Sequence, residues 1–165
     1  MLRERLSEIL ARSSAEDLLP GLEALLRGLI EEYGPESIII AGSLSKSRFV
    51  RGLSDLDILV IVAREVGKHE RFKLRAVGDV DAEISVYSAG EVLRALEAGD
   101  RFIIDAIESG EEVYGNWRAR AMRRLKEGGG PEVDLMRPFS GRRFFFKKKA
   151  GASIPCRGDL IRFGP

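Results

Sequence analysis

Asp55 and Asp57 are the residues of this sequence whose types and spacing best suit chemistry. They are separated by one residue: Asp55 directly precedes the run LDILVIV, and Asp57 is its second residue. We predict a strand over Asp55–Val62. Side chains at positions i and i+2 of a strand point to the same face, so the two carboxylates project together, with Cβ atoms about 7 Å apart. Their repulsion disfavours folding unless a cation lies between them. Because Mg²⁺ is typically held by one or two carboxylates plus substrate phosphates, the pair predicts a magnesium site.

Gly42 and Ser43 form a second element, directly after the apolar run SIIIA that we predict as a strand. A strand that turns there into a helix exposes backbone N–H groups, and such donors bind phosphate. Gly42 lets the backbone approach closely, and the Ser43 hydroxyl adds a donor. Lys46, Arg48 and Arg51 follow in the same segment and could neutralise a triphosphate. The two elements together predict a cradle for a nucleoside triphosphate with its Mg²⁺.

The segment AGSLSKS is not a P-loop, because it lacks the second glycine directly before the lysine. Either element alone is common, as a turn or as a solvated strand end. Their conjunction, G-S-x11-D-x-D between two apolar runs, resembles the DNA polymerase β-like nucleotidyltransferase superfamily. It is most similar to the small prokaryotic members, the minimal nucleotidyltransferases. The resemblance spans residues 37–115 and leaves the first thirty residues and the basic tail uncovered.

The resemblance implies a metal-dependent enzyme that moves an NMP group from an NTP, most often ATP, to an acceptor hydroxyl and releases pyrophosphate. It implies two Mg²⁺ ions, or Mn²⁺ in their place, at Asp55 and Asp57, and the β- and γ-phosphates at Gly42 and Ser43. Lys46, Arg48 and Arg51 are the further candidates for nucleotide binding.

A third carboxylate arises in that family on a later strand of the same sheet, and VDAEISVYS occupies the corresponding place here. Asp81, Glu83, Ser85 and Tyr87 share one face of a strand that we predict over 81–87. Small family members show an acid, three further residues, and then an aromatic and a small polar residue, as in EISVYS. This favours Glu83 as third metal ligand and catalytic base, with Asp81 as the second choice. The alternative for both acids is an exposed sheet face without a role.

The surrounding pattern predicts an α+β (α/β) fold, with a nucleotidyltransferase-like mixed β-sheet flanked by helices, N-terminal helices and a C-terminal extension. We expect a helix ending near Tyr33 that is broken or kinked at Pro20, and a short helix over 44–50. The other predicted helices span 2–11, 89–98, 100–109 and 117–127, and the other predicted strands span 37–41, 72–77 and 111–115. We divide the chain into N-terminal helices packed on the core (1–33), a nucleotidyltransferase domain (34–127) and a basic tail (128–165).

Charge is unevenly distributed, since residues 137–165 carry a net charge of +7 and residues 1–136 a net charge of −6. Aromatic and basic residues alternate in the tail, which permits nucleic-acid contact, a flexible extension, or an end altered by a shifted reading frame. Cys156 is the only cysteine, which excludes a disulfide or a cysteine metal cluster within one chain. No apolar run approaches the ~20 residues that span a bilayer. We therefore expect a cytoplasmic protein without membrane contact.

Minimal nucleotidyltransferases often pair with helical HEPN-type proteins as antitoxins, so the resemblance also implies a second reading. The chain would then act chiefly as a binding module that pairs with such a partner, and would modify it with AMP. The intact D-x-D pair argues against a purely non-catalytic role. A nucleotide-binding regulator without transfer chemistry is a third possibility, and the N-terminal helices could form a homodimer interface.

Overall fold

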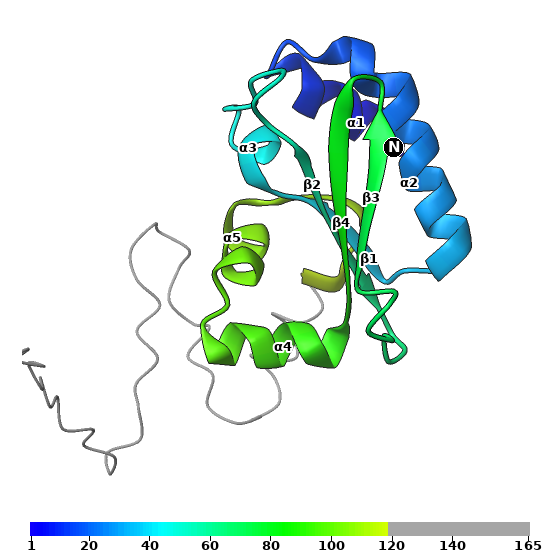
Figure 1. The fold of residues 1–165 in the computed structure, drawn as a ribbon, viewed down its shortest axis with the longest axis vertical. Helices are drawn as coiled ribbons and strands as arrows, with labels where there is room; N and C mark the ends of the chain where they lie inside the picture. Colours follow the sequence, from blue (N-terminus) through cyan, green and yellow to red (C-terminus); the bar gives the residue numbers. More distant parts are fainter. Residues whose placement is uncertain (119–165) are drawn as a thin grey trace, which may run out of the picture.

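The computed structural model describes residues 1–118, which form one mixed five-stranded sheet between two layers of helices (Figure 1). Along the sheet the strands follow the order β3-β4-β2-β1-β5. Strands β2 and β4 run parallel, and every other neighbouring pair is antiparallel. The α+β fold predicted from the sequence is thereby confirmed. The strands are β1 (Ser37–Ile40), β2 (Leu56–Val62), β3 (Phe72–Val77), β4 (Val80–Ser88) and β5 (Glu111–Gly115).

Helices cover both faces of the sheet (Figure 1). The N-terminal helices pack on one face through leucines such as Leu6 and Leu26, which are fully buried. The two helices after β4 pack on the other face through Val92, Ile103 and Ile107. The helices are α1 (Leu2–Ala11), the 3₁₀ turn η1 (Glu16–Leu18), α2 (Leu19–Tyr33), α3 (Gly42–Ser45), α4 (Ala89–Ala98) and α5 (Arg101–Ser109).

Strand β2 lies in the middle of the sheet and is buried on both faces. Ile58 and Val60 belong to the cluster beneath the N-terminal helices, whereas Leu59 and Ile61 belong to the cluster beneath α4 and α5. Asp57 is the one position of this strand that is not buried. A carboxylate in a central strand costs free energy unless something compensates it, so packing alone does not explain Asp57 at this position.

The chain leaves the end of β2, forms β3 at the sheet edge, and returns as β4 between β3 and β2. This path makes β2 and β4 parallel neighbours, with Asp57 paired to Glu83 and Ile61 to Tyr87. The beginnings of the two strands therefore lie together at one end of the sheet. The acids at positions 55, 57, 81 and 83 all belong to that end.

Several element boundaries differ from the expectations. Strand β2 begins at Leu56, so Asp55 precedes it. Helix α3 is a single turn that begins at Gly42, not a helix over 44–50. Pro20 lies in the first turn of α2, where the missing N–H has no intrahelical partner to lose. The predicted break therefore falls between η1 and α2, just before Pro20, and α2 itself is continuous.

The remaining expectations fall partly outside the described residues. Trp117 and Arg118 are helical, and the rest of the predicted helix over 117–127 and the tail over 128–165 lie beyond them. The division into domains stays a prediction. No helix within residues 1–118 is both long enough and apolar enough to cross a membrane.

Candidate active site

Asp57 and Glu83 are direct partners across the parallel pair β2–β4. Neighbouring strands lie about 4.8 Å apart, and paired positions of a parallel ladder present their side chains to the same face. Both residues are half-buried. They lie on the face that α4 and α5 cover farther along the strands, where Leu59 and Ile61 are buried. The parallel register therefore places two carboxylates side by side at the rim of an apolar layer.

Asp55 and Asp81 flank this pair at the same end of the sheet. Asp55 stands immediately before β2, and Asp81 lies two residues before Glu83, on the same face of β4. Both are exposed, in contrast to Asp57 and Glu83. The structure thus brings the four predicted acids to one region, with Glu83 closer in register to Asp57 than Asp81 is.

Asp57 is surrounded by more negative than positive charge. Burial raises the pKa of Asp57, and the negative charges of Glu83, Asp55 and Asp105 raise this pKa further. The Lys46 ammonium acts in the opposite direction. A cation bound among these carboxylates would relieve the repulsion.

Gly42 fits against the carboxylate of Asp57 so closely that no side chain could stand between them. A Cβ added to Gly42 would lie 1.9 Å from Asp57 Oδ2, and the backbone at Gly42 has φ of +65°, a conformation that favours glycine. The Ala41 N–H also donates to the Asp57 carbonyl at 2.8 Å, which extends the β1–β2 pairing to the edge of the site. The predicted phosphate-binding turn and the predicted metal-binding acid are therefore in contact.

The segment after Gly42 coils tightly. The Ser45 hydroxyl donates to the Gly42 carbonyl at 3.1 Å, and the Arg48 N–H donates to the Ser43 carbonyl at 2.9 Å. Leu44 is buried and anchors this turn beside β2. Ser43 itself is half-buried at the position that the sequence indicates for a phosphate-binding hydroxyl.

The three cations of this segment are directed differently. Lys46 forms an ion pair with Asp105 of α5, with Nζ 2.6 Å from Oδ1. The Arg51 guanidinium instead pairs with Asp17, at 2.5 Å, and with Asp79 in the turn between β3 and β4, at 3.0 Å. Arg48 is exposed. Of the three, Lys46 lowers the pKa of Asp57 through its positive charge.

A match to a family model shows to which protein family this chain belongs. Residues 22–152 match the model of the nucleotidyltransferase domain. The chain belongs to the nucleotidyltransferase domain family. The resemblance to the DNA polymerase β-like superfamily is thereby confirmed, and the chain is a nucleotidyl-group transferase by family. No curated protein matches the chain.

Members of this nucleotidyltransferase superfamily generally use a divalent metal, and the donors present fit that requirement in part. Within residues 1–118, no three or more acids, histidines or cysteines are grouped closely enough to hold a metal ion on their own. The donors at the site are oxygen atoms, which Mg²⁺ prefers, and Mg²⁺ commonly takes its remaining ligands from water and substrate phosphates. The prediction that the metal ligands are Asp55, Asp57 and Glu83 stays a prediction. It is consistent with a metal ion that arrives bound to its nucleotide.

Asp105 is a charged residue beside the candidate site that the sequence alone does not predict there. It lies in α5, nearly fifty residues beyond Asp57. The sequence of this helix indicates only its buried side, which is formed by Ile103, Ala106 and Ile107. Helical periodicity indicates which side of a helix is buried, but not which strand end lies beside the helix. No local signal in the sequence could have connected Asp105 with Lys46.

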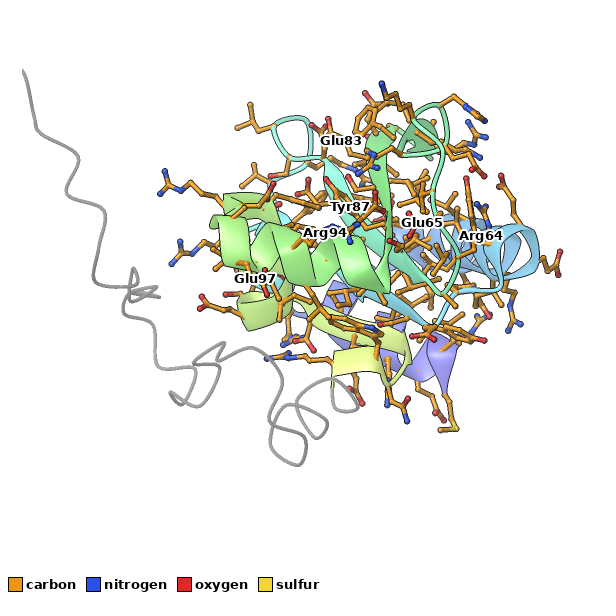
Figure 2. The ribbon with its side chains drawn as sticks, turned by 90° about the horizontal axis from the view of Figure 1, so that it is seen from below. Arg64, Glu65, Glu83, Tyr87, Arg94 and Glu97 are labelled. Carbon is orange, nitrogen blue, oxygen red and sulfur yellow. The ribbon has the colours of Figure 1, made fainter. Side chains whose placement is uncertain are left out.

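A second cluster, at the other end of β4, fixes the start of α4. Ser88 and Glu91 form a capping box, in which the Ser88 N–H donates to the Glu91 carboxylate at 2.8 Å and the Glu91 N–H to the Ser88 hydroxyl at 3.2 Å. Arg71 pairs with Glu91 and lies over the Tyr87 ring, 5.3 Å from its centroid. Figure 2 shows Glu83 and Tyr87 following each other along β4 toward α4. The S-x-x-E pattern could have revealed this cap from the sequence.

Proposed function

We propose that this nucleotidyltransferase moves an NMP group from a Mg²⁺-bound NTP, with ATP as the first candidate, to an acceptor hydroxyl. Asp55 and Asp57 hold the divalent ions, completed by Glu83 or, as second choice, Asp81. When bound, the ions supply charge neutralisation at the attacking and leaving oxygens. The observation that carries this proposal is the register that sets Glu83 beside Asp57, while Gly42 lies against the Asp57 carboxylate.

Different residues of the chain bind the phosphates and accept the proton during the transfer. The backbone at Gly42 and Ser43 binds the β- and γ-phosphates, and Lys46 donates to the same oxygens. The acceptor oxygen attacks the α-phosphorus in line, forming a new P–O bond while the bond to the bridging oxygen of pyrophosphate breaks. Glu83 accepts the proton of the acceptor hydroxyl. Because this reaction needs little covalent participation by the protein, positioning and charge supply most of the rate enhancement.

The test is incubation of the protein with each α-labelled NTP and Mg²⁺, with candidate acceptors, followed by detection of pyrophosphate and of an NMP adduct by mass spectrometry. We expect Asp57→Asn to lower the rate by at least about a hundredfold, the usual scale for loss of a group that stabilises transition-state charge. Glu97→Gln, an exposed carboxylate on α4, is the matched control and should retain full activity. Undiminished activity of Asp57→Asn would refute the assignment.

A second candidate function is that of an antitoxin-like module that pairs with a helical HEPN-type protein and modifies it with AMP. The observation that favours a docked protein is an apolar shelf beside the acids. Phe72 and Leu74, on the edge strand β3, are 52% and 57% exposed, and Leu74 is the register partner of Glu83. Changing both to serine should abolish partner capture while Mg²⁺-ATP binding persists. Partner capture unaffected by this double change would exclude the shelf.

The finer assignments stay with these proposals. Arg48 and Arg51 as nucleotide ligands, a homodimer, and nucleic-acid contact through the tail are predictions that follow from the sequence alone. Arg51 is the weakest of them, because phosphate binding would compete with its ion pairs to Asp17 and Asp79.

A further inference from the structure

One ion pair connects the predicted phosphate-binding segment to a helix that follows much later in the chain. Lys46 comes directly after α3, and its Nζ lies 2.6 Å from Oδ1 and 2.7 Å from Oδ2 of Asp105 in α5. Both carboxylate oxygens thus face the ammonium. The two side chains are 33% and 38% exposed, so the pair lies at the mouth of the site and not in the core. α3 also packs against both β2 and α5.

Stability alone does not account for a carboxylate at this place. Ion pairs with this degree of exposure contribute little to stability. Asp105 also adds a negative charge to the region of Asp57, where Asp55 and Glu83 already repel that carboxylate. The unliganded fold would lose little if Asp105 were neutral. The structure does show both oxygens of the Asp105 carboxylate directed at the Lys46 ammonium.

The fixed position of Lys46 suits a polyphosphate. Lys46 directly follows the single turn α3, whose first residue, Gly42, touches the Asp57 carboxylate. A triphosphate bound at this turn, with its metal ion at Asp57, lies within reach of the Lys46 side chain. An ammonium group has three N–H donors, so Lys46 can keep its contact with Asp105 and still donate to a phosphate oxygen.

We propose that Asp105 is a positioning residue for the nucleotide, which holds the Lys46 ammonium beside Asp57 and Gly42 ready to contact the triphosphate. This inference rests on the proposed function, because it assigns a role in NTP binding. A long lysine side chain would otherwise sample many rotamers, and ordering it on binding would weaken affinity. Asp105 orders it in advance.

An alternative account, in which Asp105 does not position Lys46, predicts the opposite change in nucleotide affinity when Asp105 is removed. If Asp105 were only one more negative charge near the site, its removal would reduce repulsion of the anionic nucleotide and tighten binding. If it positions Lys46, its removal weakens binding, and only while Lys46 is present. A double-mutant cycle on these two residues therefore separates the accounts.

The experiment measures the dissociation constant of Mg²⁺-ATP, and of the other Mg²⁺-NTPs, by titration calorimetry for the wild type, Lys46→Met, Asp105→Asn and the double variant. We expect Lys46→Met to weaken binding about tenfold or more, the scale of a lost charge-assisted hydrogen bond. Asp105→Asn should weaken it by about three- to fivefold, the scale of an exposed ion pair. In the Lys46→Met background, Asp105→Asn should cause no further weakening.

Matched variants guard against a folding artefact. Glu108→Gln removes a carboxylate one turn farther along α5 and should leave the dissociation constant unchanged. Asp105→Glu, which keeps the charge, should recover part of the affinity. In turnover, Asp105→Asn should raise the KM for NTP while kcat changes by less than about twofold.

Two failures can be told apart. If the wild type binds no Mg²⁺-NTP at all, both the proposed function and this inference are overturned. If the wild type binds and Asp105→Asn tightens binding, or changes it equally in both Lys46 backgrounds, the positioning role alone is overturned and the proposed function stands.

Discussion

Replacing Asp57 by asparagine should stabilise the unliganded protein while abolishing transfer. The substitution keeps the shape of the side chain against Gly42 but removes a charge that Glu83, Asp55 and Asp105 repel. A site organised for a cation carries this penalty when no cation is bound. Stability and activity should therefore move in opposite directions at this one residue.

The magnitude follows from the register of the two central strands. Asp57 and Glu83 are direct partners, so their carboxylates lie on strands about 4.8 Å apart. Two unit charges about 6 Å apart repel by about 3 kcal/mol at an effective dielectric constant of about 20. Because both groups are partly exposed, solvent and salt reduce this repulsion. We expect the free energy of unfolding to rise by about 1 kcal/mol in Asp57→Asn at neutral pH.

The stability that Asp57→Asn gains over the wild type should depend on pH, and it should grow as the pH rises. Burial and the neighbouring acids raise the pKa of Asp57 in the folded state above its unfolded value. The folded wild type therefore binds more protons than the unfolded chain in the window between these two pKa values. Its stability falls as the pH rises from the unfolded value, about 3.9, through the raised folded value. The advantage of Asp57→Asn should be small near pH 4 and complete at pH 7.

Urea unfolding at pH 7 and at steps down toward pH 4 provides the assay, with Glu97→Gln as the control. Adding Mg²⁺ together with ATP at pH 7 should raise the unfolding midpoint of the wild type and change that of Asp57→Asn much less. An Asp57→Asn protein that is less stable than the wild type at pH 7, or whose advantage does not shrink on acidification, would refute the reasoning.

Four further substitutions test other parts of the site and of the fold. Gly42→Ala should lower the free energy of unfolding by about 1–3 kcal/mol and reduce activity, because its Cβ would displace Asp57 and the backbone there is left-handed; urea unfolding and turnover measure both. Glu83→Gln should lower kcat by about a hundredfold or more, whereas Asp81→Asn should stay within about tenfold of the wild type, since Glu83 is the partner of Asp57; the reverse order would transfer the role to Asp81. Ser88→Ala should lower stability by about 1 kcal/mol through loss of the capping box, with kcat/KM almost unchanged, as thermal unfolding and turnover would show.

Much of the local structure could be predicted from the sequence, because its signals lie within a few residues. The apolar run after Asp57 predicts a central strand, and alternation around Glu83 predicts β4 to within a residue at each end. Helix α4 has the predicted bounds, since a capping box and a following glycine delimit it. The pairing of a Gly-Ser turn with D-x-D predicts the superfamily, which the match to the family model confirms.

The arrangement of the site could not be predicted in the same way. Nothing local indicates that β4 inserts between β3 and β2, yet this order alone makes Glu83 the partner of Asp57. The same limit applies to Asp105, whose contact with Lys46 depends on how α5 crosses the sheet. Arg51 shows the same limit, because proximity in sequence to the phosphate-binding turn predicts a role in nucleotide binding but does not reveal the ion pairs of its side chain with Asp17 and Asp79.

The contact between Gly42 and Asp57 ties the evolutionary histories of two positions together. A side chain at position 42 would displace the acid at position 57, so we expect a relative that changes the first residue to lose the function of the second as well. Descendants of this fold that have turned from catalysis to pure binding should therefore have lost both residues as a pair, and a survey of their sequences would reveal that joint loss.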